Sequence, residues 1–98
     1  MEWQFHPEAE AEFIESAEYY EGEVPGLGLR FSRAVREALD LLLENPDIGS
    51  KQPYGFRSFV LGTFPYSIIY AAHENLLFVL AIAHGSRKPR YWKSRLSR

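Results

Sequence analysis

The spacing of apolar residues changes near the middle of this chain. Before residue 45, apolar side chains recur every three or four positions, which is the period of an amphipathic helix. After residue 55 they form short runs rich in β-branched and aromatic residues, which is typical of strands. The chain is therefore expected to form helices first and a sheet afterwards, in an α+β fold.

A short strand and a helix are expected at the start. Trp3–Phe5 alternates apolar and polar residues, and Pro7 both ends this strand and suits the first turn of a helix. The apolar stripe of the helix consists of Ala9, Phe13, Ala17, Tyr20 and Val24. The stripe should face the core, whereas the glutamates should lie on the solvated outer face. These are Glu8, Glu10, Glu12, Glu15 and Glu18.

A second helix is expected after Pro25-Gly26, and Asn45-Pro46 should end it. Its apolar face consists of Phe31, Ala34, Val35, Ala38, Leu39 and Leu42. The short connection makes the two helices an antiparallel hairpin. Gly26-Leu27-Gly28 is similar to a phosphate-binding loop, but it follows a helix and lacks a third glycine, so no ligand is expected there.

Three strands are expected at residues 56–61, 64–72 and 76–83. Their connections are short enough for hairpin turns, so the strands should pair antiparallel in chain order. Residues 76–83 are apolar throughout, which predicts an interior strand covered on both faces, with the helical hairpin on one of them. The expected order is β-α-α-β-β-β in a single domain, residues 1–98, with a basic C-terminal tail.

Charge is divided unevenly along the chain. The first 49 residues have a net charge of −9 and the last 49 a net charge of +7. Five cations crowd the tail around Tyr91 and Trp92: Arg87, Lys88, Arg90, Lys93 and Arg95. Cations interleaved with aromatic rings suit a polyanion, because cations neutralise phosphates and rings stack on unpaired bases. The alternative is a solvated terminus whose rings pack back on the sheet.

Four residues are candidates for a ribonuclease-like site. His84 would be the general base, Arg87 and Arg57 would stabilise charge on the phosphate, and Tyr91 would donate a proton to the departing oxygen. Their spacing alone specifies no site. His84 stands at a strand end, and a hydrogen-bonded structural role explains it more simply.

Several classes of site are not expected. The chain has no cysteine, which excludes disulfides and thiolate metal sites and is compatible with a reducing cytoplasm. His6, His73 and His84 are scattered, so neither a metal nor a cofactor is expected. No apolar run approaches the ~18 residues that a membrane span needs. We therefore expect a cytoplasmic protein without membrane contact.

Several stretches form a wider pattern: Tyr19-Tyr20-Glu21, Pro25-Gly26-Leu27-Gly28 with Phe31, Asn45-Pro46, Phe64-Pro65-Tyr66 with Ile69-Tyr70, and residues 84–92. Together they resemble the RelE/ParE superfamily of toxins from bacterial type II toxin–antitoxin modules. The resemblance covers nearly the whole chain and agrees with the expected order of elements. It implies a growth-inhibiting toxin that a cognate antitoxin neutralises, in a toxin–antitoxin hetero-oligomer.

The resemblance also bears on chemistry. In the RelE branch, which cleaves messenger RNA in the ribosome, two lysines lie on the first strand after the helices and an arginine on the next. These positions correspond to Ser58, Val60 and Ser67. The RelE branch also has an arginine beyond the last strand and a tyrosine near the end of the chain. Arg87 corresponds to that arginine, and Tyr91 corresponds approximately to that tyrosine. Each missing donor would cost about 2.7 to 4 kcal/mol of transition-state stabilisation by analogy with oxyanion sites.

The ParE branch has a similar fold and inhibits DNA gyrase without a known catalytic constellation. The resemblance is therefore closer to ParE than to RelE, and it implies DNA gyrase as the target. Two alternatives stay open: a RelE-like ribosome-dependent mRNA endoribonuclease, and a non-toxic antitoxin-binding module of the same fold.

Overall fold

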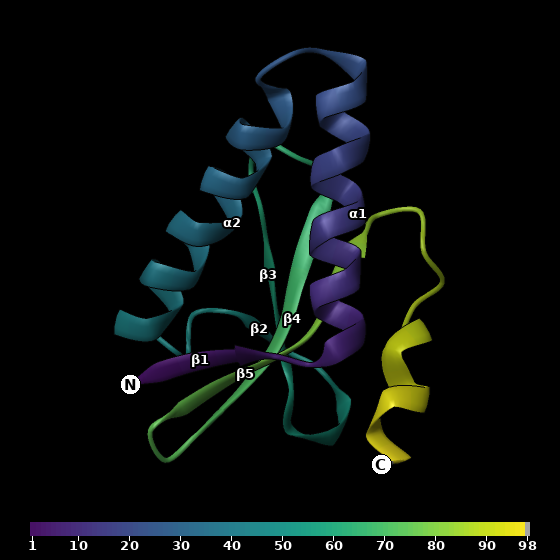
Figure 1. The fold of residues 1–98 in the computed structure, drawn as a ribbon. Coiled ribbons are helices and arrows are strands. Elements are labelled where there is room, and N and C mark those ends of the chain that lie inside the picture. Colours follow the sequence, from purple (N-terminus) through teal and green to yellow (C-terminus); the bar gives the residue numbers. More distant parts are fainter. Residues whose placement is uncertain (98) are drawn as a thin grey trace.

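The computed structural model describes residues 1–97, in which a helical hairpin packs on one face of a five-stranded sheet (Figure 1). The elements are β1 (Glu2–Phe5), α1 (Pro7–Glu23), α2 (Leu27–Glu44), β2 (Ser50–Lys51), η1 (Pro53–Gly55), β3 (Arg57–Val60), β4 (Tyr66–His73), β5 (Leu76–His84) and η2 (Tyr91–Ser97), where η denotes a 3-10 helix. The expected α+β order is confirmed. The two-residue strand β2 and both 3-10 helices add to it.

The strands follow the order β1-β5-β4-β3-β2 across the sheet. β3, β4 and β5 pair antiparallel in chain order, as predicted. β1 pairs with the outer edge of β5 and runs parallel to it, which makes the sheet mixed. This pairing ends where the His6 N–H donates to the carbonyl of Val79 at 2.8 Å. The next residue, Pro7, has no N–H with which to continue the ladder.

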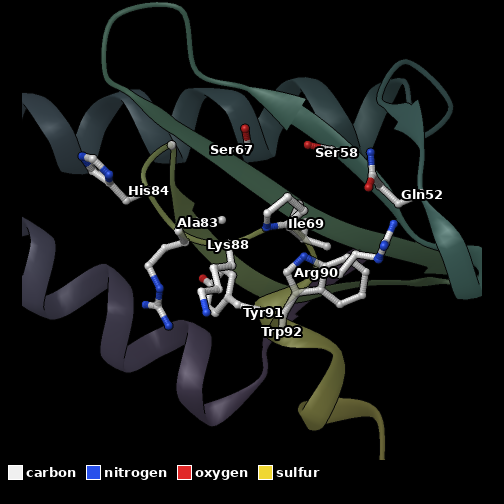
Figure 2. Close-up of a pocket in the computed structure, with 13 residues that line it drawn as sticks. Gln52, Ser58, Ser67, Ile69, Ala83, His84, Lys88, Arg90, Tyr91 and Trp92 are labelled. Carbon is white, nitrogen blue, oxygen red and sulfur yellow. The ribbon is translucent and has the colours of Figure 1, made fainter.

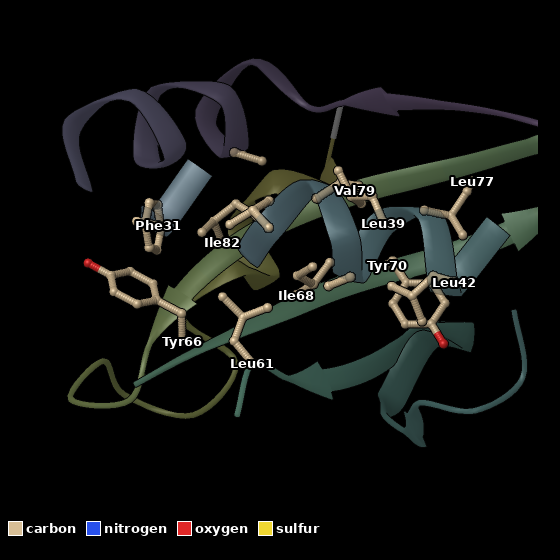
Figure 3. Close-up of a cluster of buried hydrophobic side chains, with 13 residues drawn as sticks. Phe31, Leu39, Leu42, Leu61, Tyr66, Ile68, Tyr70, Leu77, Val79 and Ile82 are labelled. Carbon is tan, nitrogen blue, oxygen red and sulfur yellow. The ribbon is translucent and has the colours of Figure 1, made fainter. Parts of the chain in front are cut away.

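The core lies between the hairpin and the sheet (Figure 3). α1 begins with the His6 Nδ1 accepting the N–H of Glu8 at 3.0 Å, and it buries Ala9 completely. α2 buries Phe31, Val35, Ala38, Leu39 and Leu42, which were all predicted. Val24 was expected on the apolar stripe of α1, but it lies just beyond the helix and is 51% exposed.

The other face of the sheet is covered by the C-terminal segment. Trp92 is 3% exposed and belongs to a second apolar cluster with Ile69, Leu80 and Ala81. The tail is therefore packed on the sheet, and its buried tryptophan supports the second of the two interpretations of the sequence. This packing also explains why residues 76–83 of β5 are all apolar: the hairpin covers one face and η2 the other.

In the loop between the helices, a carboxylate of the protein itself binds the free backbone N–H groups. Glu21 accepts the N–H groups of Gly26 and Gly28, both at 3.0 Å. Gly28 also allows the helices to approach closely, because a Cβ there would lie 2.5 Å from the carbonyl oxygen of Ala17. A Cβ on Gly22, in the last turns of α1, would meet nothing within 4 Å.

We predict opposite effects for the same substitution at these two glycines. Gly28→Ala should lower the free energy of unfolding by about 1 to 3 kcal/mol, because the methyl group forces α1 and α2 apart. Gly22→Ala should raise it by up to about 1 kcal/mol, because alanine favours the helix and adds no contact. Urea unfolding measures both. Equal effects would contradict the close approach of the helices at Gly28.

Candidate functional site

The carboxylate of Glu12 on α1 joins the C-terminal segment to the sheet. It accepts hydrogen bonds from Arg95 Nη1 at 2.9 Å and Nη2 at 2.7 Å, and from the Tyr91 hydroxyl at 2.5 Å. The prediction that Glu12 faces solvent with the other glutamates is wrong, because its side chain is only 15% exposed. Its partner, Arg95, lies 83 residues further along the chain, where helical periodicity carries no information.

This network lies where β1 leaves the edge of β5. The Arg95 Nη1 donates to the carbonyl of Leu80 at 2.9 Å, and Glu12 Oε1 accepts the N–H of Ile82 at 3.0 Å. A β-bulge in the pairing of β4 with β5 displaces Leu80 from the regular ladder. The two charged side chains thus satisfy backbone groups of β5 beyond the reach of β1.

The network shifts the pKa values of its members. Burial alone would raise the pKa of the Glu12 carboxyl, but hydrogen bonds from Arg95, Tyr91 and the Ile82 N–H outweigh burial and hold the pKa below its usual value. Burial and the hydrogen bond to Glu12 raise the pKa of the Tyr91 phenol well above its usual value. Tyr91 therefore holds its proton firmly and directs it at Glu12.

A hollow of about 180 Å³ lies next to this network, between the sheet and the segment 87–90 (Figure 2). His84 lies at one end and Gln52 at the other, and Ser58 and Ser67 lie along the strands. The full lining is Gln52, Ser58, Ser67, Ile69, Ala83, His84, Gly85, Arg87, Lys88, Pro89, Arg90, Tyr91 and Trp92. Among these residues are three cations and no carboxylate.

The structure brings three of the four candidate ribonuclease residues, His84, Arg87 and Tyr91, to this hollow. The Nδ1 of His84 accepts the N–H of Ser86 at 2.9 Å, so the proton of the neutral ring is on Nε2. In this tautomer no free lone pair of the ring faces a substrate. His84 is thus hydrogen-bonded in the manner of a structural residue.

Arg87 is half exposed at the mouth of the hollow. Its guanidinium carbon lies 3.8 Å from the centroid of the Tyr91 ring, and its Nη1 lies 3.8 Å from Glu12 Oε2. The stacking orients the side chain, and Glu12 offsets part of its charge. Arg87 therefore remains available to an anion but does not present a full unpaired charge.

Arg57 does not line the hollow. Its Nη1 donates to the carbonyls of Asp47 at 3.1 Å and Gly49 at 2.8 Å, and its backbone is paired with Tyr70, whose side chain is in the core beneath the helices. Successive residues of a strand point to opposite faces. Since Ser58 lines the hollow, alternation along β3 directs Arg57 to the other side of the sheet.

The strand positions where a RelE-type site would carry cations lie on the face of the hollow. Ser58 and Ser67 line it, and Val60, which is paired with Ser67, is 67% exposed. All the cations of the hollow come instead from the segment beyond β5. Within residues 1–97, no helix is long and apolar enough to cross a membrane, and no three His, Asp or Glu side chains are grouped to hold a metal ion.

We predict that Glu12→Gln makes the free energy of unfolding less sensitive to a fall in pH. The pKa of Glu12 is lowered by folding, so its contribution is complete above its unfolded value of about 4.5 and is lost as the pH falls below it. At pH 7 the variant should lose about 1 to 3 kcal/mol, because a charged hydrogen-bond partner is removed.

Urea unfolding at several pH values between about 7 and 3 measures this effect. The difference in the free energy of unfolding between the wild type and Glu12→Gln should shrink as the pH falls through that range. Glu15→Gln, on an exposed position of the same helix, is the matched control and should follow the wild type. A constant difference between wild type and Glu12→Gln at all pH values would contradict the role of the ionised carboxylate.

Comparisons with known proteins agree with this architecture. The family described as the ParE toxin of the type II toxin–antitoxin system parDE matches residues 4–89. A solved chain from the chromosomal ParDE system of P. aeruginosa is similar in fold, with a TM-score of 0.73 and 19% identity over 86% of this chain and 95% of that one. No curated protein sequence matches the chain.

At 19% identity, the solved structure establishes the fold alone. The family match reaches from β1 to the segment that borders the hollow, which is most of the chain. The resemblance to the ParE side of the RelE/ParE superfamily is thereby confirmed. The chain belongs to the ParE toxin family of type II toxin–antitoxin systems.

Proposed function

We propose that this ParE family member inhibits growth by acting on DNA gyrase and does not cleave RNA. The observation that carries the proposal is the composition of the hollow. Its strand wall presents Ser58 and Ser67 where an RNA-cleaving relative would present cations. Membership of the ParE family supports gyrase as the target.

The hydrogen bonds around the hollow support the same conclusion. Cleavage of RNA through its own 2′-hydroxyl needs a base, an acid and cations around the crowded phosphate. The Nδ1 of His84 accepts a hydrogen bond from the Ser86 N–H, and the Tyr91 hydroxyl donates one to Glu12. Arg57 lies behind the sheet, so Arg87 is the one arginine of the candidate set that lines the hollow.

We further propose that a cognate antitoxin covers the edge of β3. β2 pairs only with Arg57 and Ser58, so the edge of residues 59–60 that faces away from β4 has no partner strand within residues 1–97. A groove of about 250 Å³ runs beside it, lined by Leu41 of α2 and by Phe59 and Val60. An extended segment of a partner could pair with the open edge and place apolar side chains in the groove.

Gyrase inhibition is the first prediction to test. Purified toxin at micromolar concentration should reduce ATP-dependent supercoiling of a relaxed plasmid by gyrase. Relaxation of the same plasmid by a type I topoisomerase should be unaffected, which controls for effects on the DNA. Normal supercoiling at these concentrations would contradict the proposed target.

The RNA-cleaving alternative gives a different result in cells. Induction of the toxin should arrest growth while messenger RNA stays intact, and Arg87→Ala combined with His84→Ala should leave RNA integrity unchanged. Transcripts cleaved by the wild type and spared by the double variant would instead identify a ribonuclease. Normal growth after induction of folded protein would favour the non-toxic binding module.

Antitoxin binding should appear as thermal stabilisation. A partner that binds only the folded toxin at 100 times its Kd adds about 2.7 kcal/mol, so the Tm should rise by several degrees with the product of the neighbouring gene. Val60→Lys places a charge beside the groove and should reduce the shift, whereas Glu15→Lys on α1 should not. A Tm unaffected by the antitoxin would contradict the proposal.

A further inference from the structure

We propose that the hollow beside residues 87–90 binds one strand of nucleic acid through its phosphodiester backbone, without cleaving it. This binding activity goes beyond the proposed action on gyrase. Lys88 and Arg90 line the hollow, are exposed, and form no ion pair with any residue of the part that the structure describes. Cations without counter-ions around a concave surface attract an anionic ligand.

The backbone of Arg90 supports a functional role for its side chain. Arg90 has φ +59°, a left-handed conformation that costs an L-residue free energy and that glycine adopts without strain. From this position its side chain extends over the hollow toward Gln52 (Figure 2). An arginine kept in a strained conformation that directs its charge into a hollow indicates a binding role.

A second strained residue lies near the same end of the hollow. Tyr54 has φ +67°, comes two residues after Gln52, and is 57% exposed. The Nζ of Lys93 lies 5.8 Å from the centroid of its ring. Among residues 1–97, the other non-glycine residue with positive φ is Glu74, in the tight turn between β4 and β5, where such a conformation is ordinary.

The exposed ring of Tyr54, next to Lys93 and close in sequence to Gln52 of the hollow, favours a nucleic acid strand over an acidic peptide. Cations alone bind carboxylates and phosphates equally well. An aromatic ring also provides a surface on which an unpaired base can stack, and an acidic peptide has no base. Bases of a duplex are already stacked on one another, so the ring favours a single strand. The hydroxyls of Ser58 and Ser67 add neutral donors suited to phosphate or sugar oxygens.

The same geometry keeps the strand intact. The proton of the neutral His84 ring is on Nε2, and the proton of Tyr91 is directed at Glu12. The hollow therefore supplies positive charge without a group to remove a 2′-hydroxyl proton. It is expected to bind DNA and RNA strands alike, because the contacts are to the backbone.

Fluorescence anisotropy with the full chain and labelled oligo-dT and oligo-U tests this inference. Both should bind, and affinity should fall with salt, since each phosphate contact adds about 0.7 to the slope of log K against log salt for single strands. Arg90→Gln and Lys88→Gln should each reduce the slope by about 0.7. Arg33→Gln, on an exposed position of α2, is the matched control and should leave the slope unchanged.

Two further variants separate binding from folding. Tyr54→Ala should weaken binding about fivefold or more with an unchanged salt slope, because it removes stacking and no charge. Arg90→Gly should raise the Tm, because glycine relieves the backbone strain, and at the same time lower the affinity. A purely structural Arg90 would not move stability and affinity in opposite directions.

Several outcomes would overturn the inference. These are absence of salt-dependent binding, an equal loss of affinity in Arg33→Gln, tighter binding of duplex DNA, and tighter binding of a poly-glutamate peptide of equal charge. Cleavage of the oligo-U would overturn the statement that the strand stays intact. Inhibition of gyrase by a toxin that binds no oligonucleotide would overturn this inference alone and leave the proposed function in place.

Discussion

The carboxylate of Glu12 is the interaction on which the arrangement of this toxin's functional face depends. It links α1 to η2 through Arg95 and Tyr91, and it links both to β5 through the Ile82 N–H. The Arg95 side chain is only 6% exposed, and its Nε also lies 3.4 Å from Glu8 Oε1, so two carboxylates of α1 hold this buried charge and Glu12 is the one that accepts both of its Nη hydrogen bonds. Trp92, which covers the second face of the sheet, is held in the same 3-10 helix.

The network also determines what the neighbouring hollow can do. The Tyr91 hydroxyl donates a hydrogen bond to Glu12, and the Tyr91 ring stacks against the Arg87 guanidinium. Groups that resemble catalytic residues in the sequence are thus used to hold the tail in place, and Lys88 and Arg90 are left to face solvent. A surface of this kind suits binding to a large or polyanionic target better than it suits proton transfer.

Much of the fold follows from the sequence, because helical and strand periodicity are local. The stripe from Phe31 to Leu42 predicted α2, and alternation along β3 is sufficient to separate Ser58 from Arg57. Pairings between distant residues leave no such local signal. The contact between Glu12 and Arg95 and the parallel pairing of β1 with β5 both depend on the folded chain.

A double-mutant cycle on Glu12 and Arg95 tests the central claim most directly. The free energy of unfolding would be measured at pH 7 for the wild type, Glu12→Ala, Arg95→Ala and the double variant. Two groups in one network should have a coupling energy of about 1.5 to 3 kcal/mol, so that the second substitution costs much less once the first is present. Additive effects, within about 0.5 kcal/mol, would contradict the claim that this carboxylate holds the C-terminal segment on the sheet.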